Sequence, residues 1–216
     1  MNNATLQAKI CSGYAKAAAR LGSRYMRYRP RGAGAVLTPE NMIGPVTAAF
    51  DVDPGFTFKA PSKYTNPIFY ALLDGTLVQP SDYLVGVDGT FFVAGMQSLV
   101  PILCLQCNVN LTISRPPGNT GHGAQPYGGL IPGADIPVIA SWPASVLQGT
   151  KGEKGDTNLP GDVRMPWYAA KLPNLPGGAL IKTADEVVDS TGARYKVSSA
   201  ELTGLGWRLT LALTET

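Results

Sequence analysis

The sequence has little charge and no long apolar run. Charged residues make up 15% of its 216 residues, whereas about a quarter is usual in globular proteins. The longest apolar stretches, such as residues 99–105, fall far short of the roughly 20 residues that a helix needs to cross a bilayer. We therefore expect a protein without a membrane span.

Cysteine is also scarce, with three residues, an odd number that cannot form a closed set of disulfides. Cys104 and Cys107 are three positions apart in a segment that has the pattern of a strand. Their side chains then point to opposite faces, which suits neither a redox motif nor a zinc site. We expect reduced and mostly buried thiols in a protein that assembles in the cytosol.

Histidine occurs once, as His122 in a glycine-rich run. A catalytic histidine must be held rigidly by a third group, and metal sites need several ligands close together. Two carboxylate pairs, Asp51 with Asp53 and Glu153 with Asp156, have the residue types of a glycosidase, but nothing in the sequence indicates a cleft around them. We expect no enzymatic activity, and no catalytic residue, cofactor or metal.

Glycine and proline are abundant instead, with 25 and 18 residues. Both residues favour turns and neither suits the interior of a helix, so the composition predicts short strands joined by many turns. Near the C-terminus, Trp207, Leu209 and Leu211 alternate with Arg208 and Thr210, which is the period of a strand with one buried face. The expected fold class is mainly β.

Part of the chain repeats itself without a gap at an offset of 103 residues. The matching pairs are Gly75 and Gly178, Leu77 and Leu180, Val78 and Ile181, Asp82 and Asp185, Val85 and Val188, Gly89 and Gly192, Phe92 and Tyr195, and Leu99 and Leu202. Each copy contains a strand opened by aspartate, a turn with glycine and a strand with an aromatic residue. We interpret the match as a duplication, although two ordinary hairpins can also resemble each other by chance.

These patterns divide the chain into four segments. They are a basic N-terminal helix and arm (residues 1–40), a first β module (41–115), a Gly/Pro-rich linker (116–160) and a second β module (161–216). The two modules are expected to be similar small barrels or sandwiches. The linker either forms strands in part, around residues 136–142, or reaches a neighbouring subunit. Asp82 and Asp185 are expected to cap turns by accepting hydrogen bonds from backbone N–H groups.

The N-terminal segment combines a helical pattern with charge of one sign. Leu6, Ile10, Tyr14, Ala17 and Leu21 recur at spacings of four and three, which places them on one stripe of a helix. We expect this helix to run from about residue 4 to residue 21 and to end at Gly22. Residues 1–39 contain seven Lys or Arg and no acid, a net charge of +7, whereas the remaining chain carries −4.

The arm after the helix interleaves four arginines with two tyrosines. Such a segment can bind nucleic-acid phosphates and stack on bases, can dock on an acidic protein surface, or can simply be solvated. The candidate residues for contact with a partner or with DNA are Lys9, Lys16, Arg20, Arg24, Tyr25, Arg27, Tyr28, Arg29 and Arg31.

Several short stretches resemble virion structural proteins of tailed bacteriophages. Residues 9–18 (KICSGYAKAA) with 28–30 (YRP), and residues 82–85 (DYLV), 89–94 (GTFFVA) and 99–103 (LVPIL), look like virion-associated proteins of tailed phages and prophages. Residues 191–197 (TGARYKV) with 205–209 (LGWRL) are similar to small β-barrel proteins of phage necks and tails. The resemblance covers roughly half of the chain and assigns no catalytic or binding residue.

The resemblance implies a structural subunit of the neck (head–tail connection), tail or baseplate, in a virion assembled in the host cytoplasm. Its partners would be other virion proteins and copies of itself, in a ring or another homo-oligomer. The basic N-terminus would line a DNA channel, with non-specific contact to phage DNA, or anchor the subunit on an acidic adjoining ring. Deletion of residues 1–31 would then leave folded β modules that no longer enter particles. The alternatives are a phage enzyme that degrades cell wall or polysaccharide, and a nucleic-acid-binding module.

Overall fold

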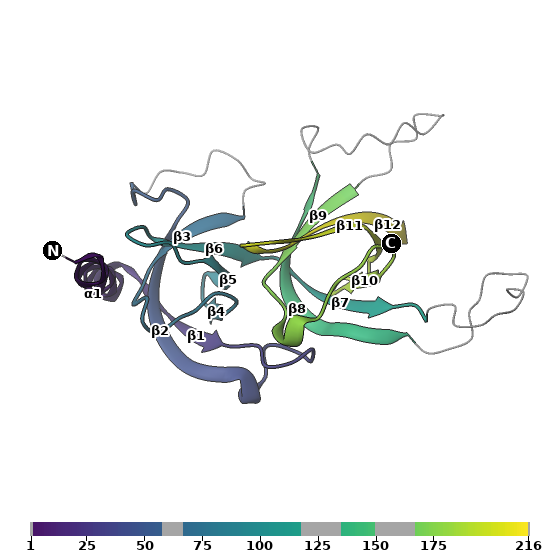
Figure 1. The fold of residues 1–216 in the computed structure, drawn as a ribbon, viewed down its shortest axis with the longest axis horizontal. Helices are drawn as coiled ribbons and strands as arrows, with labels where there is room; N and C mark the ends of the chain where they lie inside the picture. The colour runs from purple at the N-terminus through teal and green to yellow at the C-terminus, as the bar shows by residue number, and fades with distance from the viewer. Residues whose placement is uncertain (1, 58–66, 118–134, 150–166, 216) are drawn as a thin grey trace, which may run out of the picture.

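The computed structural model describes residues 2–57, 67–117, 135–149 and 167–215. Within these ranges the chain is mainly β, with one α-helix at the N-terminus. The strands form two closed barrels of six strands each, which lie side by side (Figure 1). The mainly β class, the N-terminal helix and the two similar barrel modules are thus confirmed.

Each barrel is continuous in the sequence. Barrel 1 follows the helix α1 (Asn3–Leu21) and comprises β1 (Ser23–Tyr28), β2 (Met42–Asp51), β3 (Ile68–Leu72), β4 (Tyr83–Gly86), β5 (Gly89–Gly95) and β6 (Ile102–Cys107). Barrel 2 comprises β7 (Val109–Arg115), β8 (Ile136–Gln148), β9 (Trp167–Leu172), β10 (Glu186–Asp189), β11 (Arg194–Thr203) and β12 (Gly206–Glu215). Short 3₁₀ turns, η1 (Pro39–Asn41) and η3 (Pro176–Gly178), precede β2 and follow β9.

The two barrels have the same topology. Their strand orders are β1-β2-β3-β6-β5-β4 and β7-β8-β9-β12-β11-β10, so each strand of barrel 1 has a counterpart six strands later. Closure occurs where β1 pairs with β4 and where β7 pairs with β10, in both cases antiparallel. The repeated order supports the duplication that the sequence match predicts.

The strand pairing shows that the two repeats are offset by one residue after the turn, so the sequence match is not gapless. Leu84 on β4 pairs with Phe91, and Val187 on β10 pairs with Tyr195. The residue of barrel 1 that corresponds to Tyr195 is therefore Phe91. The sequence match at an offset of 103, which aligns Tyr195 with Phe92, is wrong by one position here. One more residue lies between Val187 and its partner Tyr195 than between Leu84 and its partner Phe91, which shifts the register of the strand that follows.

The chain passes from one barrel to the other at Asn108, which lies between β6 and β7. The expected segments therefore do not coincide with the barrels. Strand β1 lies in the segment expected to be an arm (residues 1–40), β7 lies in the expected first module (41–115), and β8 lies within the expected linker (116–160). The boundaries differ because closure recruits strands that are far from the repeated hairpins in the sequence.

The core of barrel 1 is aromatic. Tyr25, Phe50 and Phe69 surround Phe91, with ring centroids 6.2, 4.0 and 5.4 Å from it. The Tyr25 ring also packs directly on Gly86, where an added Cβ would lie 2.4 Å from a ring carbon. Aromatic pairs of this kind contribute about 0.5–1.5 kcal/mol each beyond the area that they bury.

A second cluster joins the two barrels. On β4 and β5, Leu84 and Phe91 point into barrel 1, whereas their neighbours Tyr83 and Phe92 belong to the cluster that continues into barrel 2. The Tyr83 hydroxyl donates to the Pro143 carbonyl oxygen at 2.9 Å, and its ring meets Trp142 edge to face. Both faces of β5 are therefore buried, one in the core of barrel 1 and the other in this second cluster, which we call the shared core because residues of both barrels contribute to it.

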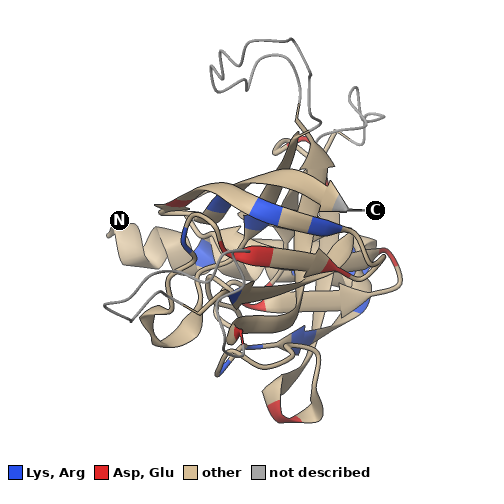
Figure 2. Ribbon diagram, turned by 90° about the vertical axis from the view of Figure 1, so that its right-hand side faces the viewer, with Lys and Arg blue, Asp and Glu red and all other residues tan. Residues whose placement is uncertain are grey.

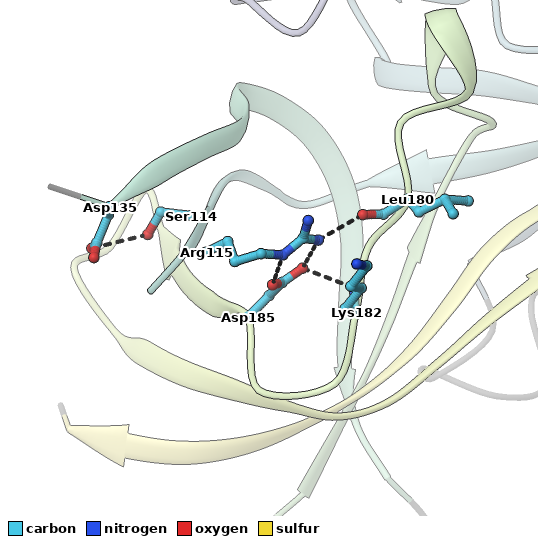
Figure 3. A network of polar contacts seen from close by, with 6 residues as sticks. All are labelled: Ser114, Arg115, Asp135, Leu180, Lys182 and Asp185. Carbon is cyan, nitrogen blue, oxygen red and sulfur yellow. Dashed lines mark hydrogen bonds and ion pairs between the residues drawn. The ribbon is translucent and has the colours of Figure 1, made fainter. Parts of the chain in front are cut away.

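Each barrel is closed by an arginine and a buried aspartate, which we call the closure pairs. In barrel 1, Arg29 Nε and Nη2 donate to the two Asp82 carboxylate oxygens at 2.7 and 2.8 Å. In barrel 2, Arg115 Nε and Nη2 donate to Asp185 at 2.8 and 2.9 Å, and Arg115 also reaches the Leu180 carbonyl oxygen (Figure 3). Both aspartates are completely or almost completely buried.

The same carboxylates also cap turns, which confirms the role expected for them. Asp82 accepts from the backbone N–H of Gln79 at 3.0 Å, and Asp185 accepts from that of Lys182 at 2.7 Å. The hydrogen bond to aspartate raises the pKa of Arg29 and of Arg115, against the opposing effect of burial. A buried carboxylate is costly unless it is paired and hydrogen-bonded, and each closure pair meets both requirements.

Replacement of Arg115 by methionine should remove the charge partner of Asp185 and lower the free energy of unfolding by about 2–3 kcal/mol. This is less than the loss of a fully buried pair because 29% of the Arg115 side chain is exposed. Urea unfolding measures the change, and the matched control is Lys196→Met on an exposed position of the same barrel. Equal stability of the two variants would contradict a stabilising closure pair.

Tyr83→Phe should leave the Pro143 carbonyl without its donor and destabilise the protein by about 1 kcal/mol. Because Tyr83 and Phe92 of barrel 1 pack in the same cluster as the core of barrel 2, both the wild type and this variant should unfold in a single transition followed by tryptophan fluorescence and circular dichroism. The control is Tyr70→Phe, at a half-buried position on β3. Two separate transitions in the wild type would show that the shared core does not couple the barrels.

Candidate partner-binding surface

The helix α1 lies on the outside of barrel 1, at the end of the molecule away from barrel 2 (Figure 1). The Asn2 side chain caps its N-terminus by accepting from the Ala4 N–H, and the helix ends at Gly22 as the sequence predicts. Gly22 is required there because an added Cβ would lie 2.4 Å from the Ala48 carbonyl oxygen on β2. The tight exit fixes the helix against β2 and β3.

The helix packs through a face that is rotated from the expected stripe and overlaps it at Tyr14. Ala18 is its one buried residue, and Gln7, Cys11 and Tyr14 lie on the same side against barrel 1. Leu21, which the expected stripe places in the interface, is 59% exposed. The close approach at Gly22 favours a small side chain at the contact, so Ala18 faces the barrel and the larger apolar residues are turned partly outward.

A half-open pocket of about 330 Å³ lies between α1 and barrel 1. Its walls come from Gln7, Cys11, Tyr14, Leu73, Gly75, Thr76, Met96, Gln97, Ser98 and Ile102. Gln7 Oε1 accepts from the Leu99 N–H at 2.8 Å, which ties the helix to a loop residue with a φ of 68°. Burial, followed by the influence of Cys11, raises the pKa of Tyr14.

The nine candidate contact residues fall into two groups. Five have exposed side chains: Lys9, Lys16, Arg20, Arg24 and Arg31. The other four, Tyr25, Arg27, Tyr28 and Arg29, lie on β1 or directly after it and are integrated into barrel 1. The structure therefore brings together Lys9, Lys16 and Arg20 on one helix and removes most of the arm from the candidate surface.

Tyr25 is the most deeply buried of the four residues that belong to barrel 1, with 1% of its surface exposed. Its hydroxyl donates to Asp88 at 2.6 Å, and burial together with this hydrogen bond raises its pKa. Arg29 belongs to the closure pair with Asp82. Tyr28 packs against the shared core, and Arg27 has a buried Nε without a hydrogen-bond partner among the described residues.

A sequence signal for the closure arginines exists. Both are followed directly by proline, in Arg29-Pro30 and Arg115-Pro116. The repeat at an offset of 103 does not reveal them, because they are 86 positions apart. The first three strands of each unit are separated from the repeated hairpin by connections of different length, which hides the correspondence.

Charge is distributed differently over the two barrels. The described residues from 32 to 57 and from 67 to 108 contain no Lys or Arg, and their acids are Glu40, Asp51, Asp53, Asp74, Asp82 and Asp88. On barrel 2 both signs mix along the strands (Figure 2), as where Glu186 pairs with Lys196 across β10 and β11. Apart from the arginines on and directly after β1, the described charged residues of barrel 1 beside α1 are therefore all acidic.

The residues considered for catalysis have structural roles where they are described. The Asp53 carboxylate accepts from the Gly55 N–H at 2.9 Å and from the Thr57 hydroxyl, and Asp51 accepts from the Asp53 N–H. His122, Glu153 and Asp156 lie outside the described residues. Within the described part of the chain, no three His, Cys, Asp or Glu residues gather as metal ligands, and no helix has the length and apolar character needed to cross a membrane.

Comparisons with protein-family models, curated proteins and solved structures found no match to this chain. The feature that stands out from the structural framework is the exposed basic face of α1, which Gly22, Ala18 and Gln7 hold against barrel 1.

The three cysteines should react very differently with a thiol reagent. All are free, but Cys104 is fully buried, and burial raises the pKa of both the Cys104 and the Cys107 thiols. Cys11 instead lines the half-open pocket. One thiol should therefore react in the native protein and three in urea, measured by the absorbance of released thionitrobenzoate. Cys11→Ser should abolish the native reaction, and a native reaction that persists would show that Cys104 or the half-buried Cys107 is accessible in barrel 1.

Proposed function

We propose that this chain is a structural subunit of a tailed-phage virion, placed in the neck, tail or baseplate. It acts by protein–protein assembly around the DNA path and not by catalysis. The observation that carries the proposal is a rigid double barrel that displays its basic charge on one surface helix. The resemblance of the short stretches supplies the class of particle.

Rigidity supports an assembly role. Domains joined by a small polar interface move relative to each other, whereas a large apolar interface holds them together. Here Tyr83 and Phe92 from barrel 1 enter the same core as Trp142 from barrel 2. The Trp142 Nε1–H also donates to the Gly34 carbonyl oxygen at 2.9 Å, which fixes the β1–β2 connection against barrel 2. A subunit of this kind keeps its binding surfaces at a constant separation.

The two ends of the molecule also differ, as ring assembly requires. A closed ring with cyclic symmetry uses heterologous contacts, in which two different surfaces of each subunit meet. One end of this chain carries α1 with Lys9, Lys16 and Arg20. The other end is barrel 2, with mixed charge on β10 and β11. Copies of the chain and other virion proteins are accordingly its proposed partners.

The structure changes how the N-terminus should be tested. Deletion of residues 1–31 would remove β1, including Tyr25 in the core and Arg29 in the closure pair. Barrel 1 would then lose a strand and its closure, so the truncated protein would fail to assemble because it fails to fold. Side-chain replacements on α1 leave both features intact.

The wild-type protein should copurify with particles of the phage or induced prophage whose genome encodes it. Particles banded on a density gradient, with the chain quantified by mass spectrometry, should contain it at a constant ratio to the major capsid protein. Immunogold labelling should place it at the neck, tail or baseplate. The control is an abundant host protein of similar size, which should be lost on banding. Loss of this chain on banding would overturn the proposal.

A further inference from the structure

The outward side of α1 carries two adjacent stripes. At about 100° per residue, Lys9, Lys16 and Arg20 lie within about 40° of one another and extend over about 16 Å of the helix. All three side chains are exposed. This group, the basic stripe, lies on the opposite side of the helix from Ala18, which faces the barrel.

The second stripe is apolar and lies between the basic stripe and the barrel. Leu6, Ile10 and Leu21 fall within about 60° of one another around the helix axis. Leu6 and Ile10 are half-buried, and Leu21 is 59% exposed. The barrel therefore covers this apolar stripe in part, although the sequence pattern alone predicts that the stripe forms the packing face.

The combination of the two stripes favours a protein partner over a nucleic acid. Phosphates bind the cations of a basic helix but offer no counterpart to an apolar stripe. Base stacking requires exposed aromatic rings, whereas Tyr25 is in the core of barrel 1 and Tyr28 packs against the shared core. One of the arginines interleaved with these tyrosines, Arg29, already forms an ion pair with Asp82.

Charge complementarity defines the partner surface. The helix α1 carries three basic residues, Lys9, Lys16 and Arg20, and no acid, so a complementary partner surface supplies carboxylates. Arg20 can form a bidentate pair with a carboxylate, and Lys9 and Lys16 act as point charges. An amphipathic helix of this kind binds by laying its apolar residues into a groove.

We propose that α1 docks through Leu6, Ile10 and Leu21 into an apolar groove with an acidic rim on a neighbouring virion protein, where its basic stripe pairs with the carboxylates of the rim. This inference depends on the proposed function, because it names the surface through which the subunit joins its assembly. The partner is a different protein, so contacts between copies of this chain use surfaces other than α1, and α1 remains folded on barrel 1 when it binds.

The test uses full-length protein with Lys9→Gln, Lys16→Gln and Arg20→Gln combined, since glutamine preserves helix propensity while removing charge. Binding to each structural protein encoded next to the chain is measured by calorimetry at 150 mM salt. The triple variant should bind one neighbour at least tenfold more weakly than the wild type. Leu21→Gln should weaken the same complex several-fold.

Two further variants serve as matched controls. Lys182→Gln with Lys196→Gln removes exposed charge from barrel 2 and should leave binding unchanged. Lys9→Arg and Lys16→Arg combined, with Arg20 retained, preserve charge and should bind as the wild type does. Circular dichroism and urea unfolding confirm that each variant is folded.

Several outcomes would overturn the inference. They are undiminished binding of the triple variant to every neighbour, equal loss in the barrel 2 control, or concentration-dependent self-association through α1 without a neighbour. Tight binding to a 20-base-pair duplex or to phosphatidylglycerol vesicles that is lost in the triple variant would assign the stripe to nucleic acid or lipid instead. If the wild type is present in particles and the triple variant enters them equally well, this inference fails while the proposed function stands.

Discussion

The buried aspartate at the start of the fourth strand is the constraint on which each barrel depends. Asp82 and Asp185 are almost inaccessible to solvent and would be unfavourable as unpaired charges. Each receives an arginine from the end of the first strand and a backbone N–H from the preceding turn. One carboxylate thus determines both the turn and the strand pair that closes the barrel, and the same arrangement occurs in both barrels.

The shared core determines what remains available at the surface. Alternate residues of β4 and β5 serve barrel 1 and the contact with barrel 2, so neither face of β5 is open to a partner. Because both barrels are closed, nearly all of their strand edges are hydrogen-bonded to a neighbouring strand. This limits the binding of a partner by strand addition. Surface charge on α1 and on barrel 2 is then the principal chemical difference between the two ends of the molecule.

The candidate surface was predictable in part. The helix, its end at Gly22 and the exposure of Lys9, Lys16 and Arg20 follow from spacing and charge, which are local properties. The burial of Tyr25 and the ion pair of Arg29 do not follow from these local properties. An arm rich in arginine and tyrosine has the composition of an interaction segment, but Tyr25 fills the aromatic core and Arg29 neutralises Asp82, whose position depends on a strand more than 50 residues away.

The sequence by itself determined the mainly β class, the repeated hairpin with its aspartate and glycine, and the N-terminal helix, because each arises from propensities and contacts between residues close in the chain. Only the tertiary structure decided which strands complete each barrel, that the chain changes barrel at Asn108, and which side of α1 faces outward. Barrel closure and helix docking depend on contacts between residues that are distant in the sequence. Examples are the close approach of Gly22 to the Ala48 carbonyl oxygen and the hydrogen bond from Tyr83 to Pro143, neither of which the spacing of apolar residues predicts.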